Sequence, residues 1–127
     1  LSASAALDES HWSRLVRKYR GQTLEGTTSA HFDGPIRAIQ CGLELAKLSD
    51  ASFGVHTGAV VRRGREVSGP AVDVAESVAA LAPAGSVWVT RVLVALVPGS
   101  ELSFDENGSA VSSQGREIAL FSVRHQS

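Results

Sequence analysis

The polar residues best placed for chemistry share one face of a predicted helix that begins near Pro70. Proline is tolerated in the first turn of a helix, and Ser68 just before it is a possible cap. Apolar residues recur at three- and four-residue spacing and predict one buried stripe, made of Val72, Ala75, Ala79 and Ala82. The opposite face carries Asp73, Glu76, Ser77 and Ala80.

Asp73 and Glu76 on this face could form an acidic pair for acid/base work or hold a stray cation. Carboxylates on the exposed face of a helix are nevertheless commoner than either arrangement. What the chain does depends on this face.

Other residue types with chemical potential favour structural roles. The histidines His11, His31, His56 and His125 contain no pair at the short spacing typical of metal ligands. We expect His56 to be a strand residue with a hydrogen-bond partner. Cys41 lies near the buried stripe of a predicted helix and is expected to be packed rather than reactive. As a single cysteine it forms no internal disulfide, which favours a reducing, cytoplasmic location.

A basic turn precedes the helix that carries Asp73. Gly64 sits among charged residues and predicts a turn. Arg62, Arg63 and Arg65 would then form the tip of a basic hairpin. Such a tip is usually a solvated turn, and the functional alternative is docking to an acidic partner domain or to phosphate. These three arginines are therefore candidates for partner docking.

Composition indicates a single domain, spanning residues 1–127, with one hydrophobic core. Of its residues, 43% are apolar and 20% are charged. The net charge of −1 gives no drive toward nucleic acid, so no direct nucleic-acid binding is expected. No segment approaches the roughly 20 apolar residues of a membrane span, and none resembles a signal peptide. The chain lacks methionine and begins at Leu1, so we expect a fragment of a longer multidomain protein.

The first half of the chain predicts two helices and a hairpin. Residues 5–20 form an amphipathic pattern that Gly21 ends. Residues 22–32 predict a short hairpin. A second helix is capped by Asp33 and has Pro35 in its first turn. Its predicted buried stripe consists of Ile36, Ile39, Leu43 and Ala46, opposite Arg37, Gln40, Glu44 and Lys47.

The second half predicts mainly strands. Residues 53–61 alternate with period two, and residues 86–90 predict another strand. Residues 92–97 read as a short buried helix, stopped by the Pro-Gly pair that follows. Two more strands are expected near 102–105 and 117–123. Strands interleaved with helices indicate an α+β sandwich, with one sheet and helices on one face.

Three stretches of this chain resemble the class III adenylate and guanylate cyclase homology domain in its actinobacterial form. They are HFDGPIRAIQCGLELA, FGVHTGAVV and VSGPAVDVAESVAALAPAGSVWVT. The resemblance runs from about Tyr19 to Val123. It implies a ferredoxin-like β-α-β-β-α-β sandwich of the nucleotide cyclase type, with one mainly antiparallel sheet and helices packed on it.

The resemblance also implies where a cyclase would bind metal. In the family, a pair of aspartates holds divalent ions at a dimer interface, and the ions activate the 3′-hydroxyl and offset phosphate charge. The hairpin aspartate position falls near Gly26, Thr27 or Thr28, none of which supplies a carboxylate. Glu25 falls near the purine-reading lysine and reverses its charge. The other metal aspartate belongs to a strand before the first helix, and residues 1–7 show no recognisable strand, which leaves an upstream position for it.

Positions that would contact the nucleotide also differ from the family pattern. Asp73 falls at the position of an asparagine and Ser77 at that of an arginine, both implied to steady the ribose and the transition state. Pro70 falls where members often hold a purine-selective residue. With Glu76 beside Asp73, this face would repel a triphosphate.

The leading hypothesis is therefore a degenerate cyclase domain that acts as a dimerisation and regulatory signalling module without cyclase activity. It would form a homodimer through the cyclase-type interface, within a longer protein that carries a fused effector domain. One alternative is a sensor whose cleft, lined by Glu25, Asp73 and Ser77, binds a nucleotide or another small molecule. A second alternative is an active adenylate cyclase, converting ATP to cAMP with atypical residues. No cofactor is expected except magnesium or manganese in that last case.

Overall fold

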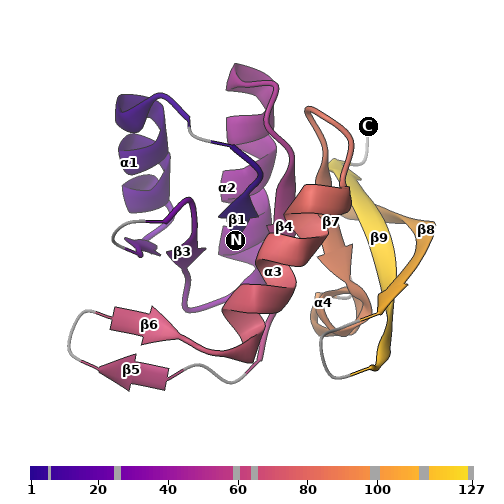
Figure 1. Ribbon diagram of the computed structural model, residues 1–127. Helices are drawn as coiled ribbons and strands as arrows, with labels where there is room; N and C mark the ends of the chain where they lie inside the picture. The colour runs from indigo at the N-terminus through magenta and orange to yellow at the C-terminus, as the bar shows by residue number, and fades with distance from the viewer. Residues whose placement is uncertain are drawn as a thin grey trace.

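The computed structural model describes residues 1–5, 7–24, 27–58, 61–63, 66–97, 101–111 and 115–125. A five-stranded sheet runs through the molecule in the order β1-β4-β7-β9-β8 (Figure 1). Strands β4 and β7 are parallel, and the other neighbouring strands of this described sheet are antiparallel. The expected mainly antiparallel α+β sheet is confirmed. The strands are β1 (Ser2–Ala3), β4 (Phe53–Val55), β7 (Val87–Thr90), β8 (Leu102–Val111) and β9 (Glu117–His125).

A strand does precede the first helix, contrary to the sequence expectation. Ser2 and Ala3 form β1 and pair with Gly54 and Phe53 of β4. Two residues are too few to show a period-two pattern, so this strand could not be predicted from the sequence. The β1 strand itself contains no carboxylate.

The predicted hairpin is confirmed and lies beside β1. Its strands are β2 (Gln22–Thr23) and β3 (Ala30–His31). Ser2 bridges Ser29, and the Ala30 amide donates to the Leu1 carbonyl at 2.8 Å. The hairpin therefore continues the sheet beyond β1.

Helices cover both faces of the sheet, so the prediction of helices on one face is wrong. Phe53 and Val55 of β4 pack into the core that contains Ile39 of helix α2 (Pro35–Leu48). Gly54, between them, faces helix α3 (Pro70–Leu81), and a Cβ there would lie 2.3 Å from the Ala75 carbonyl oxygen. A glycine adds nothing to a hydrophobic pattern, so residue spacing did not indicate this second packed face.

The α2 layer holds most of the large buried side chains. Helix α1 (Glu9–Lys18) packs against α2, and α4 (Arg91–Leu96) adds Leu93 to the same core. The predicted buried stripe of α2 is mostly wrong, because only Ile39 of its four residues is buried, whereas Leu43 and Ala46 are half-buried and Ile36 is 40% exposed. Both α1 and the sheet pack against α2, which places other residues of the helix in the core. The buried residues of α2 are Ala38, Ile39, Cys41, Gly42 and Leu45.

The α3 layer contains smaller buried side chains than the α2 layer. The predicted buried stripe of α3 is wrong at its first position, where Val72 is half-buried and Ala71 is buried instead. The buried residues of the helix are Ala71, Ala75, Val78 and Ala79. The predicted polar face of α3 is exposed. Ala75 and Ala79 allow the helix backbone to approach Gly54 closely.

Two predicted helix caps lie one residue away from their expected positions. Gly34, not Asp33, caps α2, and Gly69, not Ser68, caps α3. Proline takes the first helical position in each case, so the residue immediately before it becomes the cap. The φ of Gly69 is 125°, a backbone conformation that favours glycine.

Gly21 was expected to end α1, but the residue with the left-handed conformation that ends the helix is Arg20. Arg20, with φ of 61°, adopts the left-handed conformation, and the Gly21 amide donates to the Val16 carbonyl at 2.8 Å. Gly21 is needed for another reason, since a Cβ there would lie 2.5 Å from the Phe32 ring.

The segment predicted as one strand over 53–61 is divided. Strand β4 stops at Val55, and β5 (Val61–Arg63) pairs with β6 (Glu66–Ser68) in a separate hairpin. In Figure 1 this hairpin projects away from the central sheet, on the opposite side of α3 from β8 and β9. We call it the β5–β6 arm.

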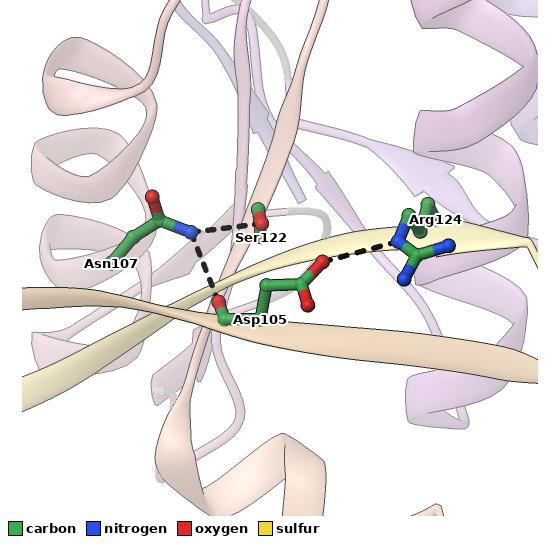
Figure 2. A network of polar contacts seen from close by, with 4 residues as sticks. All are labelled: Asp105, Asn107, Ser122 and Arg124. Carbon is green, nitrogen blue, oxygen red and sulfur yellow. Dashed lines mark hydrogen bonds and ion pairs between the residues drawn. The ribbon is translucent and has the colours of Figure 1, made fainter.

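The C-terminal strands β8 and β9 are longer than predicted. An irregularity in their register lies between Glu106 and Ser109, where Gly108 has φ of 79°. Across the hairpin, Arg124 pairs with Asp105 at 3.1 Å, and the Asn107 amide donates to the Ser122 hydroxyl at 2.8 Å (Figure 2).

The prediction of a buried helix at residues 92–97 is partly wrong. Leu93 and Val97 are buried, whereas Val92 and Leu96 of α4 are exposed. Among the described residues, no helix is long and apolar enough to cross a bilayer.

Candidate functional site

Helix α3 forms one wall of a groove of about 190 Å³. Asp73, Val74, Ser77 and Val78 line this wall. The other wall comes from the β8–β9 hairpin, which contributes Ala110, Val111, Ile118 and Leu120. We call this the α3 groove. The structure thus brings the predicted residues Asp73 and Ser77 together at one site.

Sequence reasoning missed the second wall of the α3 groove. Phe121 and Val123 of β9 belong to the core on the α2 side, so Ile118 and Leu120 point to the α3 side. The continuous apolar run from Ile118 to Phe121 in β9 was a usable signal for a strand buried on both faces. It could not show that α3, about 40 residues earlier in the chain, lies against it.

The polar groups of the groove are few. The Ser77 hydroxyl donates to the Asp73 carbonyl at 3.0 Å, so its hydrogen-bonding capacity is partly used within its own helix. Asp73, Glu76 and Ser77 are exposed. Among the described residues that line the groove, none is cationic.

The hairpin hydroxyls are occupied by backbone contacts. The Thr27 hydroxyl donates to the Leu24 carbonyl at 2.7 Å, and the Thr28 hydroxyl donates to the Ala3 carbonyl at 2.8 Å. These bonds join Thr27 to Leu24, just after β2, and Thr28 to β1. Glu25 and Gly26, the other two predicted site positions here, lie outside the described residues.

The remaining predicted site residues stand apart from the groove. Pro70 is exposed at the first position of α3 and does not line the groove. Arg63 is exposed on β5, in a hairpin as predicted, although it lies on a strand rather than in the turn. The Arg62 side chain and all of Arg65 lie outside the described part of the chain.

A second pocket, of about 270 Å³, lies between the end of β3, the start of α2 and the end of β4. His31, Asp33 and His56 contribute its titratable side chains. The His56 Nδ1 and the Thr90 hydroxyl lie 2.7 Å apart, which confirms the expected hydrogen-bond partner, although His56 follows β4 rather than lying in it. Burial lowers the pKa of His56. Of the predicted nucleotide-site residues that the structure describes, Pro70, Asp73 and Ser77 do not line this pocket.

Cys41 is packed as expected. Its side chain is fully buried in the core between α2 and the sheet. Burial raises the pKa of the Cys41 thiol to about 12, so the thiolate is scarce at neutral pH.

Comparison with solved structures decides the fold. The adenylate/guanylate cyclase/hydrolase from Silicibacter pomeroyi matches with a TM-score of 0.80 at 19% identity, over 91% of this chain and 79% of that one. The adenylyl cyclase CyaB from P. aeruginosa matches with a TM-score of 0.74 at 13% identity, over 91% and 77% of the two chains. This chain has a nucleotide-cyclase fold. At such identities the likeness establishes the fold alone.

A third match to the cyclase fold carries a ligand in its own structure. The guanylate cyclase domain of RhGC from Catenaria anguillulae, solved in complex with GTP, matches with a TM-score of 0.68 at 10% identity. The alignment covers 93% of this chain and 80% of that chain. No protein-family model matches the sequence, and no curated protein sequence matches it significantly.

The described residues of this cyclase-fold chain contain no cluster of metal-ligating side chains. Across the described ranges, no group of three or more His, Cys, Asp or Glu side chains could hold a metal ion. The first carboxylate after β1 is that of Asp8, which accepts the amide of Ser10 at 2.9 Å and caps α1. Hydrogen bonding to Ser10 and His11 lowers the pKa of Asp8, so this carboxylate is engaged as a cap.

Proposed function

We propose that this protein is a degenerate cyclase-fold domain that serves as a dimerisation and regulatory signalling module and does not turn over nucleotide. The observation that carries the proposal is the α3 groove. A cyclase needs this helix to present polar and cationic groups to its nucleotide, whereas here it presents Asp73 and Ser77 above an apolar floor.

Electrostatics argues against a triphosphate at this face. A carboxylate about 4 Å from one phosphate charge is repelled by about 1 kcal/mol in water, and by about 4 kcal/mol at an effective dielectric constant of 20. Asp73 and Glu76 are both exposed there. No described groove-lining residue supplies a compensating cation.

Loss of a cation also affects the chemical step. A positioned arginine that stabilises developing charge in phosphoryl transfer contributes about 10³- to 10⁵-fold in rate. Ser77 is too short and carries no charge, and its hydroxyl is directed to its own helix. A chain that bound ATP weakly would therefore still be a poor catalyst.

The metal requirement supports the same proposal. Thr27 and Thr28 lie where the resemblance places a metal-binding aspartate, and both donate their hydroxyl protons to carbonyl oxygens. A hydroxyl engaged in this way is a weak substitute for a carboxylate toward magnesium or manganese.

A cyclase assay tests the proposal directly. We expect no cyclic AMP or cyclic GMP above background when the protein is incubated with ATP or GTP and manganese, while an established cyclase domain gives product under the same conditions. Formation of either product, sensitive to substitution of Asp73, would instead establish the atypical active cyclase. In that case magnesium or manganese would be its cofactor.

Dimerisation is the part of the proposal that needs its own measurement. Size-exclusion chromatography with light scattering should give the mass of two chains at high concentration. A mass of one chain at every concentration would contradict the dimerisation module. We further propose that the module acts in the cytoplasm and is fused to an effector domain in a longer chain.

A ligand-sensing function is the second candidate, and the presence of both Asp73 and Ser77 in the α3 groove favours it. Thermal melts with ATP, GTP or cyclic AMP, each with manganese, would reveal such a ligand. A ligand at about 100 times its dissociation constant stabilises the fold by about 2.7 kcal/mol, which raises the midpoint visibly. An unchanged midpoint with all three nucleotides would leave the protein-protein module as the better account.

A further inference from the structure

We propose that the second pocket is a strand slot, filled by two residues of extended chain that precede Leu1 and continue β1 between β4 and β3. This inference rests on the longer chain proposed above and says how the preceding sequence is attached to the domain. It is carried by the register of the strands on both sides of the pocket.

The second pocket lies in the plane of the sheet. Its lining includes Ala38 and Leu93, on the α2 side, and Ala71 and Ala75, which are buried residues of α3 on the other side. A groove on one surface of the sheet would be lined by only one of these sets. In Figure 1 the N-terminus lies in the middle of the molecule, between β3 and α3. The opening is therefore an interruption of the sheet at the start of β1.

Leu1 already pairs like a residue inside a strand. Its nitrogen donates to the Ala30 carbonyl at 3.1 Å, and the Ala30 amide donates to the Leu1 carbonyl at 2.8 Å. Such an exchange of two bonds is the hydrogen-bonded pair of an antiparallel ladder. Burial lowers the pKa of the Leu1 amino group to about 6, because a buried ammonium is costly. A peptide N–H in the same place needs only the bond that already exists.

The backbones of the flanking strands face the slot. Ala30 bonds β1, so Phe32, two residues later and directly after β3, has its backbone groups on the same side. The Phe53 amide bonds Ser86 beside β7, so the alternate residue His56 faces away from β7 and toward the slot. Within the described part of the chain, no loop or inter-strand backbone bond takes up the amide of Phe32 or of His56. Two inserted residues would pair with both edges.

The register also predicts which side chains fill the slot. Ser2 lies opposite Gly54, which faces α3, so the residue directly before Leu1 also points to the α3 side, toward Ala71 and Ala75. The residue before that one points to the α2 side with Leu1, toward Ala38 and Leu93. A strand buried on both faces carries consecutive apolar residues. We therefore expect two apolar residues directly before Leu1.

Such an attachment suits a regulatory module. A strand held on both sides by β4 and β3 moves with the domain, whereas a flexible linker lets two domains reorient independently. Movement of the cyclase-fold domain is then passed directly to the sequence that precedes it.

Short extensions of the full chain test the slot. One protein carries Thr-Thr-Val-Val directly before Leu1, and its matched control carries Thr-Thr-Gly-Gly. Both place a peptide bond at the Leu1 nitrogen, so they differ only in the side chains and the strand propensity offered to the pocket. We expect the Val-Val extension to raise the midpoint of thermal unfolding by about 5 °C over the control.

Amide hydrogen exchange followed by NMR tests the pairing itself. We expect the amides of Phe32 and His56 to exchange about tenfold more slowly with the Val-Val extension than with the Gly-Gly extension. Amides of β8 and β9, at the other end of the sheet, should exchange equally in both proteins.

A variant that fills the pocket from inside gives a further test. Ala71→Leu places a larger side chain on the α3 side of the slot, so the gain from the Val-Val extension should fall by at least about half. Ala80→Leu makes the same change on the exposed face of α3 and should leave that gain unchanged.

The outcomes separate this inference from the proposed function. Equal midpoints for the two extensions overturn the slot, and so does a raised midpoint without slower exchange, because the side chains would then fill the pocket without forming a strand. Neither result bears on turnover or on the mass of the protein in solution, so the slot can fail while the module stands.

The preceding sequence of the longer chain provides an independent check. Two apolar residues directly before Leu1, neither of them proline, are the expected result. A charged residue or a proline there overturns the slot alone, since proline lacks the N–H that the ladder needs. A chain without preceding residues overturns the longer chain as well.

Discussion

Helices α2 and α3 lie on opposite faces of β4 and are packed in contrasting ways. On the α2 face, large side chains such as Ile39, Leu45 and Phe53 are completely or almost completely buried. On the α3 face, alanines press against Gly54, and the helix keeps its polar side exposed. The contrast indicates that the α2 layer supplies most of the stability, while the α3 layer remains available for contacts with other molecules.

The largest expected effect comes from the α2 layer. Ile39→Ala removes a side chain with no exposed surface, so it should lower the free energy of unfolding by about 2–5 kcal/mol through lost burial and a residual cavity. Urea denaturation followed by circular dichroism measures this change. Ile36→Ala is the control, because Ile36 is 40% exposed and should cost clearly less. Equal losses at both positions would contradict the assignment of the core to this face.

A smaller effect is expected where α3 touches β4. Gly54→Ala would place a Cβ 2.3 Å from the Ala75 carbonyl oxygen and 2.5 Å from the Ala79 amide nitrogen. Since both are backbone atoms, the helix must shift, and we expect a loss of about 1–3 kcal/mol in the same denaturation measurement.

Gly58→Ala provides the comparison for Gly54. A Cβ at Gly58 would lie 3.4 Å from the Ala71 Cβ, an ordinary contact, so the free energy of unfolding should change by less than about 1 kcal/mol. A Gly54→Ala protein as stable as the native one would show that α3 packs less closely than described.

The smallest effect is a pH dependence near the end of β4. Burial lowers the pKa of His56 below its unfolded value, so the unfolded chain takes up a proton first as the pH falls. The contribution of His56 to stability is therefore complete above about pH 6.5, and it is lost as the pH falls through the folded pKa.

Thermal melts from pH 7.5 to pH 5 measure this dependence. We expect the midpoint of the native protein to fall across this range more steeply than that of His56→Gln, which cannot titrate. His11→Gln, a change at a residue outside both pockets, should leave the native slope unchanged. Parallel curves for the native protein and His56→Gln would contradict the inferred burial of a neutral imidazole.

The sequence predicted those features that are local in the chain. The two faces of α3 followed from residue spacing, and the β2–β3 hairpin followed from two short strands around a turn. The exposed positions of Asp73 and Ser77 could be predicted because helix periodicity depends on neighbouring residues alone.

Features that depend on distant contacts were missed. Strand β1 is defined by its pairing with β4, about 50 residues later, and not by a pattern of its own. The β8–β9 wall of the groove meets α3 because of sheet order, which periodicity does not encode. The cap at Gly34 was assigned to Asp33 because a carboxylate is the commoner cap, whereas the proline that follows fixes the cap at the preceding residue.

The register irregularity between Glu106 and Ser109 has a consequence for solubility. Strand β8 lies at the end of the described sheet order, so ten residues of strand present one edge that no neighbour covers there. A long regular edge would template the addition of strands from other molecules and promote aggregation. The irregularity interrupts that edge near its middle, and the exposed acidic residues Asp105 and Glu106 immediately precede it. The protein can therefore keep a broad, exposed hairpin beside its groove without becoming a seed for fibrils.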